Sequence, residues 1–352
     1  MSKLLVILLI FPFAIATFGN TSEFEKVVAS FKTEKNFNGT VLIATAGKID
    51  FISAVGLADR IMNSKILPNS KFKIASITKT FTAVIILKLY EQGKIDITAT
   101  IGKYFPEYKG EGRDKVTIHQ LLTYSSGIAN ELEKGGLKSY QSPLSLDEYI
   151  NKYCSGNLEC EPGTKSVYAN TEYIILGKII EKVSGKSFEA VLQKEILSPL
   201  KMKNSGIANS KKTIAGSVKS YRQDETSKEF KPDEPYLVEN YFASGAMYST
   251  AEDLLKFDNA IFSNNILQPK TTDLMLKFYP ELGSTAYGMW GSDGYGNFAE
   301  KFYYRTGGIL GSNWNWIRTI QNKKTIIVLS NTNATNLFEL SEKLYLASIT
   351  KK

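Results

Sequence analysis

The chain has 352 residues, of which 43% are hydrophobic and 22% are charged, a composition typical of globular proteins and not of disordered or fibrous ones. Its formal net charge of +8 is spread along the sequence without a basic stripe or a nucleic-acid motif, so we expect no nucleic-acid partner. With one histidine and two cysteines the chain offers little for a zinc site, and we expect neither a metal nor another cofactor.

The N-terminus has the layout of a secretory signal peptide. Lys3 supplies a positive start, residues 4–15 are an apolar run, and cleavage is expected after Ala16 or Gly19. The alternative is a retained membrane anchor, although the run is shorter than the ~20 residues that a spanning helix needs. We predict a signal peptide at residues 1–19 and an exported protein, periplasmic or secreted, with membrane contact only if the segment is retained.

Export also affects how the two cysteines are interpreted. Cys154 and Cys160 are the only cysteines, and in an oxidising compartment they are a candidate disulfide closing a small loop. The alternative is a pair of inert thiols.

The predicted elements place strands at both ends of the chain and helices between them. We expect a hairpin over 40–55 with its turn at 46–48, and helices over 74–90, 115–124, 170–183 and 250–262, the last with Thr250 and Asp253 in a capping-box arrangement. Strands follow at 302–305, 313–320 and 324–330, then a helix over 336–349. Residues 204–235 are predicted to be a long surface excursion.

These elements predict an α+β fold in which an antiparallel β-sheet is formed from both chain ends and flanked by helices. A mainly helical region, roughly 94–240, is inserted in a single catalytic domain spanning 20–352. An active site would then lie where the sheet meets the inserted helices.

Ser76 is the candidate nucleophile. It falls at the start of a predicted helix, three residues ahead of Lys79, so both side chains point from one helix face. The helix N-terminus favours an oxyanion, and burial favours the neutral, basic form of Lys79. The only histidine, His119, lies on another predicted helix, where packing or capping is the expected role, and there is no GxSxG motif.

Ser-x-x-Lys alone is a weak signal, since it also occurs at Ser70, Ser198 and Ser348. A second element is Tyr168-x-Asn170 at a helix entrance, where a phenol and an amide could reach the nucleophile and the substrate carbonyl. The alternative is a core-packed Tyr168 and a helix-capping Asn170.

The third element is the strand end Arg305-Thr306-Gly307-Gly308. A cation, a hydroxyl and two glycines suit an edge along which an extended substrate can lie. The alternative is a strand that simply leads into a turn.

In this order and at these separations, the three elements resemble those of β-lactamase-related serine hydrolases: class C β-lactamases, DD-carboxypeptidases and penicillin-binding-protein-like esterases. The likeness extends from about Phe37 to Asn331. It implies that Ser76 forms an acyl-enzyme, that Lys79 and Tyr168 share the proton transfers, and that Asn170 holds the substrate amide and the lysine. It also implies an oxyanion hole from the backbone N–H groups of Ser76 and Gly308, and deacylation by water near Tyr168.

Two positions depart from this family pattern. Arg305 stands where relatives usually have Lys or His, and it can attract a substrate carboxylate and stabilise a Tyr168 phenolate but cannot shuttle protons. Tyr124 stands where many relatives carry histidine, and we expect it to be structural. The sequence thus predicts a serine hydrolase acting on a peptide, amide or ester, small or cell-wall derived, with a true β-lactamase or a non-catalytic penicillin-binding scaffold as alternatives.

Overall fold

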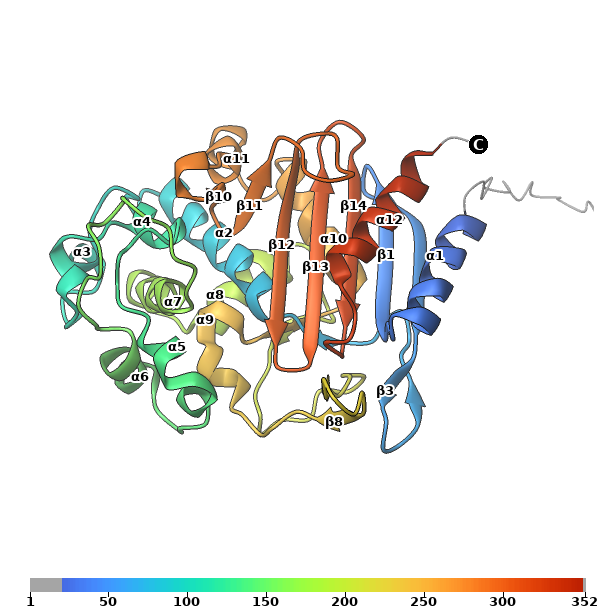
Figure 1. Ribbon diagram of the computed structural model, residues 1–352. Helices are drawn as coiled ribbons and strands as arrows, with labels where there is room; N and C mark the ends of the chain where they lie inside the picture. The colour runs from blue at the N-terminus through green and yellow to red at the C-terminus, as the bar shows by residue number, and fades with distance from the viewer. Residues whose placement is uncertain (1–20, 351–352) are drawn as a thin grey trace, which may run out of the picture.

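The computed structural model describes residues 21–350 and contains a seven-stranded sheet built from both ends of the chain (Figure 1). Its strand order is β10-β11-β12-β13-β14-β1-β2, and every neighbouring pair is antiparallel, which confirms the predicted α+β class. The predicted signal peptide, residues 1–19, lies outside the described residues. The strands are β1 (Gly39–Thr45), β2 (Lys48–Val55), β10 (Thr285–Ala286), β11 (Met289–Ser292), β12 (Phe302–Ile309), β13 (Ser312–Thr319) and β14 (Lys324–Ser330).

The first hairpin forms where the sequence predicts it. Ala46 and Gly47, between β1 and β2, both have positive φ, at 48° and 83°. A two-residue turn of this kind matches the right-handed twist of the flanking strands. Because β1 also pairs with β14, the hairpin joins the two ends of the chain in one sheet.

Helices cover both faces of the sheet. On one face, α1 (Thr21–Glu34) and α12 (Leu337–Ile349) bury an apolar cluster against alternate residues of the strands (Figure 1). On the other, α2 (Thr78–Glu91) and α10 (Ala251–Phe262) belong to the larger core. Because successive side chains of a strand point to opposite faces of the sheet, the strands contribute apolar residues to the clusters on both faces.

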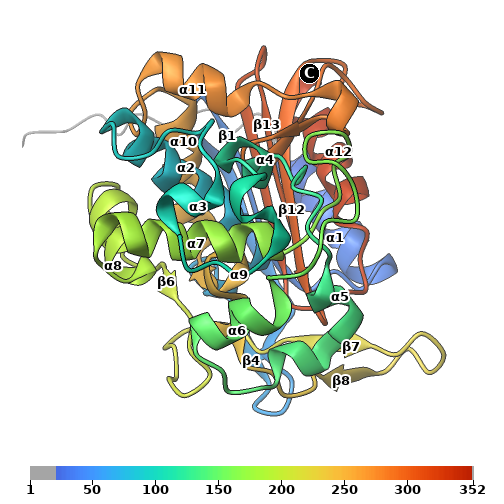
Figure 2. The ribbon, with the colours of Figure 1, turned by 90° about the vertical axis from the view of Figure 1, so that its left-hand side faces the viewer.

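The remaining helices lie mostly beside the sheet, next to α2 and the lower part of β12, at the left of Figure 1 and facing the viewer in Figure 2. No helix among residues 21–350 is long and apolar enough to cross a membrane. The remaining helices are α3 (Ile101–Tyr104), α4 (Ile118–Leu122), α5 (Glu131–Gly135), α6 (Leu146–Tyr153), α7 (Thr171–Ser184), α8 (Phe188–Leu192), α9 (Phe242–Gly245) and α11 (Pro269–Leu276). Short strands are β3 (Leu57–Asp59), β4 (Ser64–Lys65), β5 (Phe72–Lys73), β6 (Gly206–Ile207), β7 (Tyr221–Gln223), β8 (Phe230–Pro232) and β9 (Met247–Ser249).

Two sequence predictions need correction. The helix expected over 115–124 is only α4, because Thr117 and Gln120 form a capping box that starts it late and Tyr124, with φ of 56°, lies beyond its end. The disulfide is not formed: Cys154 and Cys160 are free thiols, the first buried at the end of α6 and the second half-buried. Burial raises the pKa of the Cys154 thiol and so disfavours its reactive thiolate form. The structure therefore agrees with the alternative of inert thiols.

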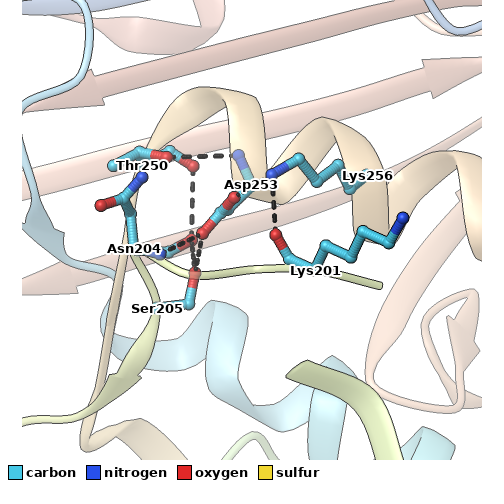
Figure 3. A network of polar contacts seen from close by, with 7 residues as sticks. Lys201, Asn204, Ser205, Thr250, Asp253 and Lys256 are labelled. Atoms are coloured by element: carbon cyan, nitrogen blue, oxygen red, sulfur yellow. Dashed lines mark hydrogen bonds and ion pairs between the residues drawn. The ribbon is translucent and has the colours of Figure 1, made fainter. Parts of the chain in front are cut away.

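The capping box expected at the start of α10 is half formed. Thr250 Oγ1 accepts from Asp253 N at 3.2 Å, as predicted, but the Asp253 carboxylate does not return to the helix start (Figure 3). Instead it accepts from Asn204 N at 2.8 Å, from Ser205 Oγ at 2.9 Å and from Lys256 Nζ at 2.6 Å. Asp253 thus ties the beginning of the 204–235 segment to α10.

Asp253→Ala is expected to destabilise the protein by about 2 kcal/mol, because it removes the acceptor of the Asn204 backbone N–H and one of the two partners of the buried Ser205 hydroxyl, which also pairs with Ser249 Oγ. Urea unfolding measures this as a lower midpoint. Lys256→Ala is the matched control, since its side chain is 44% exposed and its ion pair contributes about 1 kcal/mol or less. Equal losses of unfolding free energy in the two variants would contradict the role of Asp253 as the tie between the 204–235 segment and α10.

Candidate active site

Ser76 lies in a 3₁₀ turn, Ala75–Ile77, directly before α2, and is half-buried. Ala75 has φ of 40°, a conformation that residues with a side chain seldom adopt and that is strained by about 1–3 kcal/mol. The turn brings Ser76 to the N-terminus of α2, where free N–H groups and the positive end of the helix dipole favour negative charge on an oxygen.

Lys79 lies one turn further along, completely buried, with all three ammonium hydrogens engaged. Its Nζ donates to Ser76 Oγ at 3.1 Å, to Asn170 Oδ1 at 2.6 Å and to the Ser244 carbonyl at 2.9 Å. Burial lowers the pKa of Lys79 and Arg305 lowers it further, against the opposing effect of Tyr168, to about 8. Lys79 can therefore hold or release a proton near neutral pH.

Tyr168 approaches the same serine from the loop before α7. The residue is 41% exposed, while its hydroxyl donates to Ser76 Oγ at 2.5 Å and accepts from Arg305 Nη2 at 3.1 Å. Burial of the hydroxyl raises the pKa of Tyr168, but Lys79 and Arg305 together lower it by more, to about 8. The alternative of a core-packed tyrosine is wrong for this residue.

Asn170 precedes α7 but does not cap it, because its side chain makes no capping hydrogen bond. Its Oδ1 accepts from Lys79, and its Nδ2 donates to Tyr140 Oη at 2.8 Å. The amide is thus oriented from both sides, with its oxygen held toward the lysine.

Arg305 is completely buried, on β12. Nε donates to the Ser76 carbonyl at 2.8 Å, Nη1 to Tyr124 Oη at 3.1 Å and Nη2 to Tyr168 Oη at 3.1 Å. Its guanidinium also lies over the Trp290 ring, 4.7 Å from the centroid. The arginine is therefore engaged with the turn that carries Ser76 and with the tyrosine beside it.

Residues Thr306 to Gly308 form an open edge next to the serine. β11 pairs only with Phe302–Tyr304 of β12, so the following part of the strand has no partner on that side within residues 21–350. A Cβ on Gly307 would come within 3.4 Å of Ser76 N and 3.1 Å of the Ile74 carbonyl, so glycine keeps the strand close to the turn. Thr306 and Gly308 are exposed.

His119 and two of the three tryptophans have packing roles. His119 Nδ1 pairs with Tyr287 Oη at 2.7 Å, in agreement with the packing role expected for it. Trp314 and Trp316 are 2% exposed and belong to the core. Among residues 21–350, no group of His, Cys, Asp and Glu is arranged to hold a metal ion.

A family model described as Beta-lactamase matches residues 24–351. The chain belongs to the β-lactamase family. The teichoic acid D-alanine hydrolase of Staphylococcus aureus (strain MRSA252) is 28% identical over 251 residues, which cover 71% of this chain and 60% of that protein. The putative penicillin-binding protein PbpX of Bacillus subtilis (strain 168) is 27% identical over 321 residues, covering 90% of this chain and 77% of that protein.

Solved structures support the same fold. The octameric penicillin-binding protein homologue from Pyrococcus abyssi aligns with a TM-score of 0.80 and 24% identity, covering 94% of this chain and 78% of that one. The antiparallel sheet with flanking helices is thus the fold of the β-lactamase family, and the relatives include a protein named as a hydrolase.

Three contacts of this β-lactamase-family site were not predicted from the sequence. The Ser244 carbonyl and the Tyr140 hydroxyl bind Lys79 and Asn170, and Tyr124 accepts a hydrogen bond from Arg305. A backbone carbonyl or a single tyrosine so far away in the sequence has no sequence signature that could have predicted these contacts.

Glu172 is a further unpredicted group, two residues after Asn170 and 2% exposed. Oε1 accepts from Ser126 Oγ at 2.9 Å, while Oε2 is buried and has no hydrogen-bond partner among the described residues. Burial raises the pKa of Glu172 to about 7, with Lys79 opposing the rise. Cys154 and Tyr108 face it from other elements, and each has its own pKa raised by burial and by this carboxyl.

Proposed function

We propose that the chain is an exported serine hydrolase that forms an acyl-enzyme on Ser76 and cleaves an ester, amide or peptide bond. The observation that carries the proposal is the convergence of Tyr168 Oη and Lys79 Nζ on Ser76 Oγ, at 2.5 and 3.1 Å. A nucleophile in hydrogen-bond reach of two groups with pKa values near 8 fits general base catalysis at neutral pH.

The proposed acylation begins when the Tyr168–Lys79 pair has lost one proton. The pair takes the proton of Ser76 Oγ as that oxygen bonds to the substrate carbonyl carbon. The carbonyl oxygen becomes an oxyanion, bound by the backbone N–H groups of Ser76 and Gly308, where each donor contributes about 3 kcal/mol. The tetrahedral intermediate then expels the leaving group, which takes the proton back from the pair.

Deacylation reverses these roles. Water attacks the acyl-enzyme carbonyl near Tyr168, gives its proton to the pair and releases the acid, and Ser76 regains a proton. In this proposal Arg305 is a positioning residue: its three hydrogen bonds hold the Ser76 turn and favour the Tyr168 phenolate. Its complete burial supports this role in place of the substrate-carboxylate contact predicted from the sequence.

For the substrate class, we propose D-aminoacyl esters first, because a relative named as a D-alanine hydrolase shares the family. A second candidate is β-lactam hydrolysis, favoured by the family match itself. Turnover of a chromogenic cephalosporin separates the two, since a D-aminoacyl esterase would be acylated by it without repeated turnover.

Labelling by a fluorophosphonate probe tests the proposed nucleophile. Wild-type protein is expected to become labelled and Ser76→Ala to remain unlabelled. Ser198→Ala is the matched control, because Ser198 also belongs to a Ser-x-x-Lys sequence but is exposed and bonds Gln193. Labelling that survives in Ser76→Ala would refute the proposal.

The pH dependence provides a separate test. We expect kcat/KM to rise as pH increases toward 8, because the active form of the Lys79–Tyr168 pair has lost one proton. Glu172 raises the pKa of Lys79, so Glu172→Gln, which keeps the acceptor for Ser126, should move this rise to lower pH. Ser126→Ala is the control, because it removes the hydrogen bond between Ser126 and Glu172 but retains the Glu172 carboxyl. An unchanged profile in Glu172→Gln would show that the carboxyl does not act on the pair.

A further inference from the structure

A cavity of about 450 Å³ lies at the β11–β12 edge of the sheet, on the face that carries α12. Phe302 and Tyr304 of β12, Phe338 of α12 and the exposed Tyr295 line it with aromatic rings. Its volume lies within the range of about 300–1,000 Å³ that is common for small-molecule sites.

The polar side-chain groups that line the cavity are hydroxyls. Among residues 21–350, Tyr295 Oη, Tyr304 Oη and Ser284 Oγ make no hydrogen bond with another residue, while Ser292 Oγ accepts from Gly294 N at 3.2 Å. None of the described residues that line the cavity carries a charge. The cavity therefore combines the faces of several aromatic rings with hydroxyls that are available to a ligand.

This combination selects among ligand classes. A phosphate or carboxylate would find no cation in the lining, and a purely apolar group would cover the hydroxyls without giving them a hydrogen-bond partner. A neutral sugar ring satisfies both conditions, because its C–H bonds pack on the negative faces of aromatic rings and its hydroxyls bond those of tyrosine and serine.

Trp290 connects this cavity to the proposed active site. Its ring stacks on Tyr304 with centroids 5.8 Å apart and an interplanar angle of 22°. The centroid of the same indole lies 5.7 Å from that of the Tyr168 ring. A ligand on Tyr304 is thus separated from the tyrosine beside Ser76 by one indole.

We propose that this cavity is a subsite for a neutral sugar ring of a glycan-bearing substrate. That the sugar belongs to the substrate attacked by Ser76 rests on the proposed function, whereas sugar binding in the cavity does not. The ring would stack on Tyr304 and Tyr295, and the chain between sugar and scissile carbonyl would pass over Trp290.

Titration of the purified full chain with the trisaccharide of N-acetylglucosamine tests the binding. Trp290 is the half-buried tryptophan, while the other two are 2% exposed, so occupation of the cavity should give a saturable change in tryptophan fluorescence that Trp290→Phe removes. Tyr304→Ala should weaken binding by about tenfold or more, the loss expected of about 1.4 kcal/mol. Tyr295→Ala should weaken binding as well. Because Tyr295 is 67% exposed, this variant is expected to fold normally.

Tyr90→Ala, which removes an exposed tyrosine of α2 outside the lining, is the matched control and should bind normally. No saturable change at millimolar trisaccharide, or unchanged binding in both cavity variants, would overturn the proposal. A second experiment compares KM for two esters of one acyl group: Tyr304→Ala should raise KM for the oligosaccharide ester and leave KM for the p-nitrophenyl ester unchanged.

Fluorophosphonate labelling of the same samples keeps the two ideas apart. Labelling of Ser76 without sugar binding would contradict the subsite alone. Sugar binding without labelling would contradict the proposed function alone.

Discussion

Replacing Lys79 by methionine is expected to reduce kcat/KM by about 10³-fold or more while leaving the protein at least as stable as the wild type. The loss of activity follows from removal of a proton-transfer group, which typically contributes 10²–10⁴-fold. The lysine also gives Ser76 Oγ one of its two hydrogen bonds from the pair, at 3.1 Å. Both the proton acceptor and the orientation of the nucleophile are lost.

The expected stability has a different physical origin. Burial lowers the pKa of Lys79 from 10.5 to about 8, and a difference of this size corresponds to ~3 kcal/mol by which folding disfavours the ammonium. The penalty is fully present at pH 7, below both values, and it disappears in the methionine variant. Loss of the donors to Asn170 Oδ1 and the Ser244 carbonyl offsets part of the gain.

Thermal unfolding and steady-state kinetics on the same preparation measure both effects. Lys201→Met, an exposed lysine of another Ser-x-x-Lys sequence, controls for the loss of one positive charge. A variant that is inactive and much less stable would indicate that Lys79 mainly holds the structure together. A variant that retains activity would remove Lys79 from the proposed mechanism.

Local spacing explains why the centre of this site could be predicted. Ser76 lies in the 3₁₀ turn that leads into α2, three residues before Lys79 in its first turn, and Tyr168 and Asn170 directly precede α7, so short sequence patterns determine their relative directions. The hairpin at Ala46-Gly47 is local in the same way. The sequence predicted one sheet formed from the strands at both chain ends, which the structure confirms, and the structure adds that β1 pairs with β14 to join them.

Contacts made by tertiary packing could not be predicted. The Ser244 carbonyl reaches Lys79 across 165 positions of sequence, and only the packing of α9 against α2 brings it there. The two cysteines illustrate the opposite error: six positions of separation allow a bond, but Cys154 ends α6 facing the core while Cys160 lies outside it. Arg305 was expected to attract a substrate carboxylate and to stabilise a Tyr168 phenolate; it is completely buried and bonds the Tyr168 hydroxyl, and its burial could not be predicted from the sequence.

Arg305→Ala is expected to lower kcat/KM at pH 7 by about 10²–10³-fold and to move the rise of activity to higher pH. Arg305 lowers the pKa of Tyr168, so its removal leaves the phenol harder to ionise and a larger share of the pair in the inactive, fully protonated form at pH 7. Part of the lost activity should therefore return as the pH is raised, which a simple structural defect would not produce.

Arg305→Lys separates charge from geometry. A lysine keeps a positive charge near Tyr168, so the pH profile should stay close to that of the wild type. One ammonium in place of a planar fork cannot reproduce the three directed bonds to the Ser76 carbonyl, Tyr124 and Tyr168, so kcat should still fall. Equal relative losses of kcat/KM for substrates with and without a carboxylate would show that Arg305 acts through Tyr168 as a positioning residue. A selective rise in KM for the carboxylate substrate would instead return it to the substrate contact predicted from the sequence.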